Sequence, residues 1–372
     1  MTLDSLTNET QSMKILILAL SGIGDALMFT PALQLLQKNF PEAQIDAIVM
    51  YKGVKEIYEK TNLLSSVHYF DFLGASKLSA LRFVMKFRRK YDASINVYPS
   101  NRKEYNLINF IIGAKKRAAV QYLRNDFQNL GFLNTERILE NDSLHNVEEN
   151  LLLCEKLFSI KFTEKPRLLF PLTSEDDLFK EKYLIETGIG AHDFVVGFHP
   201  GCSMLKNHDK RRWEPEKFSR LGRLLIEKKN AKILIFGGPE ERELQNLVKQ
   251  NINSDKAFIV KTESLSQTAS IMKRCGVFVT NDSSLMHVAS ALQLDVVAVI
   301  GPTNTNYIYP WKTNYRVASL QLECAPCFFY SPKPLTCTRE DVQFKCIKEL
   351  EPEKVLEAIE DVKKGDKYSQ YS

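Results

Sequence analysis

Small and hydroxylated residues follow nearly every apolar run in the second half of the chain. In an open parallel sheet, ligands bind outside the carboxyl ends of the strands, and small residues there let backbone amides come close to a phosphate group. The segments with this composition are HPGCSM (199–204), GGPEE (237–241), KTESLS (261–266), NDSSLMH (281–287) and GPTNTN (301–306). They predict a crevice for a phosphorylated ligand, with Gly201, Cys202 and Gly237 among the residues that line it.

The NDSS segment is the most specific of these, because a helical pattern begins directly after it at Leu285. The hydroxyls of Ser283 and Ser284 and the first amides of that helix suit a diphosphate, since a helix N-terminus carries partial positive charge. The alternative is that Asp282 or Ser283 only caps the helix. Capping explains one such loop, whereas several in one sheet favour a shared crevice.

Basic residues cluster in the loop after the first strand of the second half, just before Trp213. They are Lys206, Lys210, Arg211 and Arg212, opposed only by Asp209. A run of this kind is usually a solvated face, but its place at the end of a strand favours contact with an anion. Arginine pairs well with phosphate oxygens, so Arg211 is the predicted phosphate contact.

Two histidines in these segments have two interpretations each. His287 lies inside the helical pattern, where it either contacts the ligand or is buried and bonded to a backbone carbonyl. His199 lies at a strand end and is either part of the site or structural. Both alternatives stay open.

The first apolar run, 14–20, is followed by Ser21-Gly22-Ile23-Gly24-Asp25 and then by a helical pattern. A dinucleotide fingerprint would need a third glycine where Leu27 stands and an acid near Met50. The Walker lysine is absent as well, so NAD binding and P-loop chemistry are poorly supported. Asp25 is either a first-turn acid that stabilises the helix dipole or a general base that takes a proton from a hydroxyl.

These residues are positioned by apolar runs that alternate with helical patterns. Strands are expected over 14–20, 44–50, 67–72, 93–98, 118–122, 194–198, 232–236, 257–260, 277–280 and 296–300, and helices over 26–39, 145–158 and 285–292. Strands that are apolar throughout and separated by helices indicate parallel sheets covered on both faces. The fold class is therefore α/β, with two Rossmann-like domains facing one another.

A domain boundary is expected where KPRLLFPL (165–172) precedes the charged stretch 174–182. The N-terminal domain is thus 1–172 and the C-terminal domain 173–372, in keeping with about 100–200 residues per domain. The last helix is expected to belong to the second domain or to pack back on the first. The polar tail 363–372 is expected to fray.

Composition and charge exclude several classes of protein. Fifty basic and 45 acidic residues give a net charge of +5, which is too small to imply a nucleic-acid partner. The N-terminus lacks the basic-then-apolar order of a signal peptide, and no run approaches the roughly 18 apolar residues of a spanning helix. We therefore expect a cytoplasmic protein. Basic groups at 86–90, 102–103 and 115–117 either meet an anionic membrane surface or are solvated.

Seven cysteines are an odd number and argue against a secreted disulfide framework. Four of them, Cys324, Cys327, Cys337 and Cys346, form C-x2-C-x9-C-x8-C. This spacing begins like a structural zinc site but has no second CxxC. Zinc, reduced thiols and disulfides all stay open.

Four segments, with landmarks in order over roughly residues 13–360, together resemble family nine glycosyltransferases, the lipopolysaccharide heptosyltransferase family. They are SGIGDALMFTPALQLLQKNFPEAQIDAIV, HPGCSMLKNHDKRRWEPEKFSRL, ILIFGGPEE and VFVTNDSSLMHVASALQLDVVAVIGPTN. The resemblance implies a GT-B fold with the active site in a central cleft. It also implies inverting, metal-independent transfer of a sugar from a nucleotide-diphosphate donor, with no cofactor.

The resemblance assigns roles to several residues. Asp25 is implied to be the base, with Gly22 and Gly24 on the acceptor side, and Arg211 to contact the donor phosphates where the family often has lysine. The remaining donor contacts are Asp282 toward the sugar, Ser283 and Ser284 at the diphosphate, and His287 close by. Ser284 stands where family members often have glycine.

The specific expectation is transfer of heptose from ADP-heptose to a lipopolysaccharide core or a related glycolipid or glycan acceptor. One alternative is a glycosyltransferase that uses another nucleotide sugar, and a second is a sugar-nucleotide epimerase, which would act on the donor alone. A non-catalytic sugar-nucleotide-binding protein is disfavoured by Asp25 at the position of the base.

Overall fold

The computed structural model describes residues 12–329 and 335–364. The strands of the first sheet are β1 (Lys14–Ala19), β2 (Gln44–Val49), β3 (Ser66–Tyr69), β4 (Ala93–Asn96), β5 (Lys116–Gln121) and β6 (Glu136–Leu139). Those of the second are β7 (Val195–His199), β8 (Lys232–Ile235), β9 (Ala257–Ile259), β10 (Val277–Asn281), β11 (Val296–Val299) and β12 (Tyr315–Ala318). All the pairings described between these strands are parallel.

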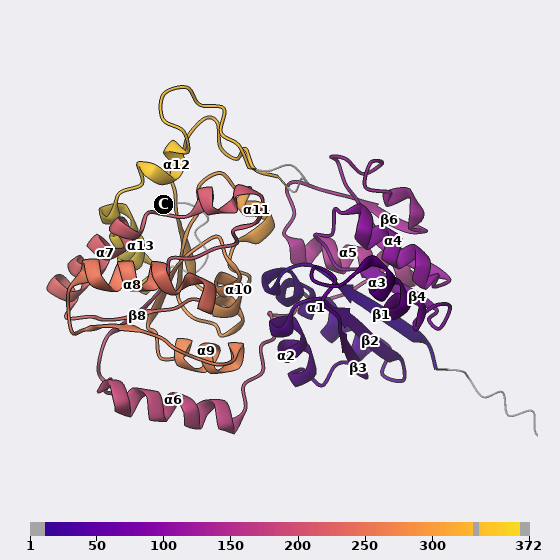
Figure 1. Ribbon diagram of the computed structural model, residues 1–372, viewed down its shortest axis with the longest axis horizontal. Helices are drawn as coiled ribbons and strands as arrows, with labels where there is room; N and C mark the ends of the chain where they lie inside the picture. Colours follow the sequence, from indigo (N-terminus) through magenta and orange to yellow (C-terminus); the bar gives the residue numbers. More distant parts are fainter. Residues whose placement is uncertain (1–11, 330–334, 365–372) are drawn as a thin grey trace, which may run out of the picture.

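The two sheets share one topology. The first has the order β3-β2-β1-β4-β5-β6 and the second β12-β11-β10-β7-β8-β9, which is the same order when each domain is counted from its own first strand. This is the order of a doubly wound Rossmann fold. The expected α/β fold of two Rossmann-like domains is therefore confirmed (Figure 1).

Helices cover both faces of each sheet. The first domain contains α1 (Ile23–Asn39), α2 (Lys52–Lys60), α3 (Lys77–Met85), α4 (Lys103–Ile112), η1 (Gly131–Leu133) and α5 (Asn146–Phe158). The later part of the chain contains α6 (Ser174–Thr187), η2 (Leu205–Arg211), α7 (Pro215–Lys229), η3 (Pro239–Glu241), α8 (Arg242–Ile252), α9 (Leu265–Met272), α10 (Ser284–Ala291), α11 (Thr305–Ile308), α12 (Lys345–Lys348) and α13 (Pro352–Lys363).

Helix α1 connects the two domains. It packs against α5 of its own domain and against α10 of the other, so one apolar core runs through both (Figure 1). Pro31 inside α1 has no amide hydrogen to donate to the carbonyl of Leu27. The hydroxyl of Thr30 donates to that carbonyl instead, at 2.7 Å, and the helix continues to Asn39.

A second contact between the domains involves two aromatic residues. His145, the residue before α5, contacts both Tyr309 and Trp311, with its ring centroid 4.5 Å from that of Tyr309 and 4.7 Å from that of Trp311. Its Nε2 lies 2.9 Å from the carbonyl oxygen of Tyr309. Burial lowers the pKa of His145 to about 3, and His287 adds to this effect, so the ring is neutral.

The predicted strands were all found, with ends shifted by up to three residues, but β6 and β12 were missed. Both are edge strands of mixed composition, ERIL and YRVA, which lack the continuous apolar run of a strand covered on both faces. The charged stretch from 174 forms α6, which packs on α9. Residues 172 and 173 lie between α5 and α6, in the segment that links the two sheets, and the domain boundary at this point stays a prediction.

Of the two placements expected for the last helix, the structure has the first, because α13 packs on β11, β12 and α7 of the second domain. Its apolar residues, such as Val355 and Ile359, belong to the core on the outer face of the second sheet. Residues 365–372 of the tail lie outside the described part. Among the described residues, none of the helices combines the length and the apolar character needed to cross a membrane.

Candidate functional site

A cleft with a volume of about 830 Å³ lies between the domains. The residues that line it follow β1, β2 and β4 of the first sheet and β7, β8, β9, β10 and β11 of the second. These are carboxyl ends of strands, as expected for an open parallel sheet. The cleft brings Gly22, Gly24 and Asp25 together with Arg211, Gly237 and the segment 282–287, all of which were predicted.

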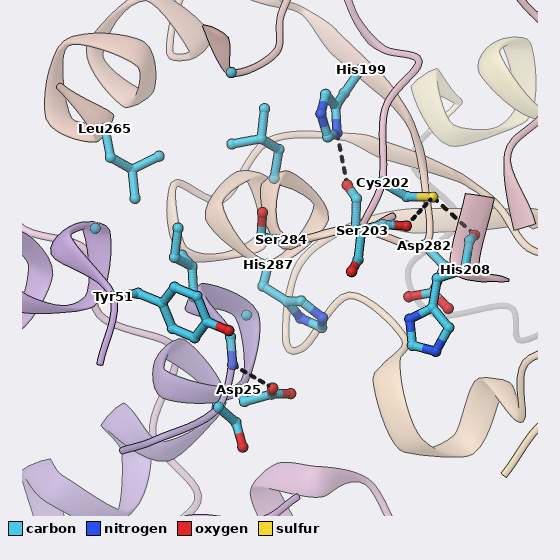
Figure 2. A pocket seen from close by; sticks show the side chains of 18 of the residues that line it. Asp25, Tyr51, His199, Cys202, Ser203, His208, Leu265, Asp282, Ser284 and His287 are labelled. Carbon is cyan, nitrogen blue, oxygen red and sulfur yellow. Dashed lines mark hydrogen bonds between the residues drawn. The ribbon is translucent and has the colours of Figure 1, made fainter. Parts of the chain in front are cut away.

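Asp25 lies in the first turn of α1 and faces the cleft. Its Oδ2 accepts a hydrogen bond from the amide of Gly22, the residue before the helix, at 3.0 Å. The interpretation as a first-turn acid is thus correct, but it does not exclude the second role. Figure 2 shows Asp25 and Tyr51 on the first domain, opposite His287, Ser284 and Asp282 on the second.

The pKa of the Asp25 carboxyl group is raised to near neutral pH. Burial raises the pKa of Asp25 to about 7, while the amide of Gly22 opposes this effect, Asp282 adds to it and Arg211 opposes it. A carboxyl group with this pKa accepts a proton far more readily than an ordinary aspartate. A general base is best placed when its pKa is near the working pH.

Arg211 and Asp282 form a buried ion pair on the opposite wall. The Nη1 of Arg211 lies 2.5 Å from Oδ2 of Asp282, and the hydroxyl of Thr303 donates to the same oxygen at 2.7 Å. The Nη2 of Arg211 lies 3.2 Å from Nδ1 of His208, and its guanidinium lies over the ring of Phe328, with the centroid 5.3 Å from Cζ. The guanidinium is therefore held at the surface of the cleft.

Two other residues of the basic loop, Lys210 and Arg212, do not line the cleft. Lys210 is exposed, and Arg212 donates to the carbonyl of Cys202 at 2.9 Å. The side chain of Lys206 lies outside the described part. A seven-residue 3₁₀ segment presents its side chains in several directions, and among the side chains of η2 that the structure describes, those of His208 and Arg211 line the cleft.

Ser283 precedes α10, but its side chain does not cap that helix. Its hydroxyl lies 2.8 Å from Nδ1 of His199, and Nε2 of His199 lies 3.1 Å from a carboxylate oxygen of Glu241. Burial opposes ionisation of Glu241, but the bond to His199, the amide of Gly238 and Arg212 together lower its pKa. We call these bonds the relay from Ser283 through His199 to Glu241. The relay fixes the hydroxyl of Ser283, and the first turn of α10 lines the cleft.

Gly201 and Gly237, in the loops after β7 and β8, make room for the side chain of Glu241. A Cβ at Gly201 would lie 1.7 Å from Oε1 of Glu241, and one at Gly237 would lie 2.8 Å from Oε2. Gly201 does not line the cleft, and its contact with a ligand stays a prediction. Cys202 does line it, but its thiol donates to the carbonyls of Ser203 and His208, at 3.4 and 3.1 Å.

His287 lies on α10 and packs against α1 across the domain interface. A Cβ at Gly24 would lie 2.6 Å from its Cδ2, so the two helices approach closely only because residue 24 is glycine. Burial lowers the pKa of His287 to about 4, and its buried Nδ1 has no partner among the described residues. The side chain is thus buried, as one interpretation expected, and it also lines the cleft, as the other required, while Nδ1 makes no bond to a carbonyl.

A sequence profile of glycosyltransferase family 9 (heptosyltransferase) matches residues 80–335. The chain belongs to glycosyltransferase family 9. It is 26% identical over 364 residues to lipooligosaccharide heptosyltransferase 2 of Campylobacter jejuni, covering 95% of this chain and 99% of that protein. A family 9 glycosyltransferase of Veillonella parvula has a TM-score of 0.73 at 21% identity, covering 94% of this chain and 97% of its own.

A further solved structure, ADP-heptose lipopolysaccharide heptosyltransferase II of Escherichia coli, has a TM-score of 0.71 at 19% identity, covering 94% of this chain and 98% of its own. These likenesses confirm the expected GT-B fold. The protein is thus a family 9 glycosyltransferase whose cleft lies between its two Rossmann-like domains.

Replacing Gly24 by alanine should loosen the contact between the domains of this glycosyltransferase. Alanine normally stabilises a helix relative to glycine, but here the methyl group would meet the buried ring of His287. We expect a loss of about 1–3 kcal/mol in the free energy of unfolding, as for an overpacked core. The double variant Gly24→Ala/His287→Ala should recover part of it in chemical denaturation. Equal stabilities of Gly24→Ala and the wild type would contradict the contact.

Two further carboxylates of the glycosyltransferase cleft were missed by sequence reasoning. Glu241 belongs to the GGPEE segment, whose glycines indicate a ligand loop but whose acids carry no pattern of their own. Glu56 of α2 accepts from the amides of Leu265 and Ser266, at 3.1 and 2.8 Å, and so binds the N-terminus of α9 across the cleft. A carboxylate is favoured there by the helix dipole. No sequence pattern links residues so far apart.

The four clustered cysteines lie outside the cleft. All four are free thiols in the structure, and Cys346 is buried whereas Cys324 and Cys327 are exposed. In residues 12–329 and 335–364, no three histidine, cysteine, aspartate or glutamate side chains are grouped as a metal ion requires. The thiols therefore do not form a zinc ligand set here, and zinc stays a prediction for this family 9 enzyme.

Proposed function

We propose that this enzyme transfers a heptosyl group from ADP-heptose to a lipopolysaccharide-core acceptor, in the cytoplasm and with inversion at the anomeric carbon. The observation that carries the proposal is the cleft itself. A carboxyl group with a pKa of about 7, Asp25, lies on one wall, and Arg211 and the N-terminus of α10 lie on the other. The names of the Campylobacter and Escherichia relatives support the sugar and the donor.

The reaction is a single displacement. The acceptor oxygen forms a bond to the anomeric carbon as the bond from that carbon to the diphosphate breaks, and the electron pair leaves with ADP. The acceptor proton moves to the carboxylate of Asp25. Attack from the face opposite the leaving group inverts the anomeric centre, which needs the base and the diphosphate on opposite walls.

The donor wall supplies positive potential for the departing diphosphate. Arg211 carries a full charge, and the first amides of α10 add the partial charge of a helix N-terminus. Asp282 holds Arg211 in place through the 2.5 Å ion pair and lies where a hydroxyl of the sugar can reach it. Ser284 and His287 complete this wall.

The acceptor wall is formed by the loops after β1, β2 and β4. Gly22 and Gly24 line the cleft beside Asp25, and Lys52 and Arg102 add two cationic side chains nearby. An anionic glycolipid is therefore the class of acceptor that this wall favours. Lysine and arginine side chains attract phosphate groups of such a molecule.

The test of the proposed function is a donor screen followed by product analysis. ADP-heptose should raise the melting temperature of the protein more than ADP-glucose or UDP-N-acetylglucosamine does, and heptose should appear on a lipopolysaccharide-core acceptor. Conversion of the donor without acceptor would instead indicate an epimerase. Donor binding with no turnover on any glycan acceptor would indicate a binding protein and contradict transfer.

We also propose that transfer needs no metal ion, because Arg211 and the α10 amides provide the charge for the leaving group. Treatment with EDTA, followed by assay in metal-free buffer, should leave the turnover unchanged within the error of the measurement. A loss of turnover that added Mg²⁺ or Mn²⁺ restores would contradict this.

A further inference from the structure

The positive charge of the chain is concentrated on one part of the first domain. Residues 77–117 contain eleven lysines and arginines but only two acids, which gives a net charge of +9. The whole chain carries +5, so the other 331 residues together carry −4. One of the two acids, Asp92, already pairs with Lys115 at 2.8 Å. The mild net charge of the protein therefore conceals a strongly basic surface.

Helix α3 in this segment has large apolar side chains on its outer side. Leu78, Leu81 and Met85 are 57%, 45% and 45% exposed. Their spacing of three and four residues places them on one face of the helix. Val84 lies on the other side of the helix and is buried in the domain core. In the described part of the chain, the outer apolar face has no covering element.

Helix α4 packs beside α3 and extends the same surface. Leu107 and Phe110 are 45% and 49% exposed and lie three residues apart on α4. Both helices contribute to the core on one face of the first sheet, so their exposed sides point away from that face together. We define the α3–α4 patch as these five side chains, Leu78, Leu81, Met85, Leu107 and Phe110.

Basic side chains surround the patch. Lys77 and Arg82 lie on α3 itself, and Lys86, Arg88 and Lys90 follow it; all five are exposed. A helix with a stripe of leucine and methionine beside lysine and arginine is typical of proteins that lie in the interface of a membrane. A solvated basic face would not need the apolar stripe, and a protein interface would not need so many unmatched positive charges.

We propose that the α3–α4 patch docks this enzyme on an anionic lipid bilayer. The inference rests on the proposed function, because a lipopolysaccharide-core acceptor is anchored in such a bilayer. Tyr105 of α4 and Arg102 just before it line the cleft. A bilayer in contact with the patch therefore lies next to the acceptor wall, and the headgroup portion of an anchored acceptor reaches Asp25 without leaving the membrane.

The experiment is co-sedimentation of the full chain with phosphatidylcholine vesicles, with and without phosphatidylglycerol. The wild type should bind only the vesicles that contain phosphatidylglycerol, and added salt should weaken the binding. We expect each of two patch variants to bind these vesicles at least about tenfold more weakly than the wild type. The variants are Leu81→Ser/Met85→Ser and Lys86→Gln/Arg88→Gln/Lys90→Gln. None of these residues lines the cleft.

A matched control is available on α6, whose residues Leu178 and Ile185 are 71% and 80% exposed. This helix carries five acids and two lysines, so Leu178→Ser/Ile185→Ser removes apolar surface from an acidic element. The control should bind as the wild type does. Equal loss of binding in control and patch variants would overturn the proposal, as would vesicle binding that the patch variants retain in full.

Two measurements separate the failures. All variants should keep wild-type turnover on a delipidated, water-soluble core oligosaccharide. Turnover of the wild type on this acceptor together with no vesicle binding overturns the docking surface alone, whereas no turnover on it overturns the proposed function. A change in elution volume of the patch variants in size-exclusion chromatography would show that a second copy covers the patch, which also overturns the proposal.

Discussion

The variant Asp25→Asn is expected to lose about 10²–10⁴-fold in kcat while it keeps the fold and binds the donor. The loss is that of a general base, because the amide cannot accept the acceptor proton. The amide oxygen can still accept the hydrogen bond that Gly22 donates to the wild-type carboxylate at 3.0 Å. Circular dichroism and a donor titration check the fold and the affinity, and a steady-state transfer assay measures kcat.

The pH dependence gives a second readout of the same group. Asp25 has a raised pKa of about 7, so its basic form predominates only above that value, and kcat of the wild type should rise with pH to a plateau above 7. Stability should change in the opposite direction. A carboxyl group whose pKa is raised in the folded state holds its proton there, so stability falls as pH rises from about 4 toward 7. Asp25→Asn should lack this fall.

A matched control separates the base from the first-turn acid. Glu104 lies in the first turn of α4, is exposed and does not line the cleft. Glu104→Gln removes a comparable contribution to a helix dipole and should leave kcat unchanged. If Asp25→Asn kept near-normal kcat, or lost no more than Glu104→Gln, Asp25 would be only a helix-stabilising acid.

The second large effect is expected for Arg211→Ala. Removing the guanidinium should lower kcat about 10²–10³-fold, as for the loss of one preorganised donor to a developing negative charge. It should also lower the free energy of unfolding by about 3 kcal/mol, because Asp282 is left as a buried carboxylate without its cation. Urea denaturation measures the stability, and the transfer assay measures kcat.

The loss of kcat and the loss of stability can be separated by a double variant and by a variant of the residue next to Arg211. Arg211→Ala/Asp282→Ala should recover stability, since no charge is left unpaired, but should stay inactive. Lys210→Ala changes the exposed basic residue next to Arg211 and should leave both quantities near the wild-type values. A loss of kcat in Lys210→Ala as large as that in Arg211→Ala would mean that the loop acts through its total charge.

The core strands of this fold were readable from the sequence because they are buried on both faces. β1 contains the apolar run ILILA and β11 is the apolar run VVAV, and both lie between helical patterns, as is typical of strands in a covered parallel sheet. The edge strand β6 is partly exposed, and β12 is buried but contains Arg316, so the mixed sequences of both strands carry no such pattern. The packing of α13 on the second domain depends on three-dimensional neighbours, and periodicity alone does not identify them.

Site residues could be predicted from the sequence where the type of a single residue, in the loop that follows a strand, indicates its chemical role. Asp25, Arg211 and the block at 282–287 lie in the cleft as expected. The small size of Gly201 accommodates Glu241, and no sequence pattern predicts that contact. The relay from Ser283 through His199 to Glu241 joins three separate loops, so its members become neighbours only in the folded chain.

The contact of His145 with Trp311 has an optical consequence. The chain contains two tryptophans. Trp213 is fully buried in the second domain, where its indole nitrogen donates to the carbonyl of Leu350 at 2.8 Å. Trp311 instead packs against a residue of the first domain. A movement of one domain relative to the other would therefore change the surroundings of Trp311 but not those of Trp213, and intrinsic fluorescence would report such a movement without any attached dye.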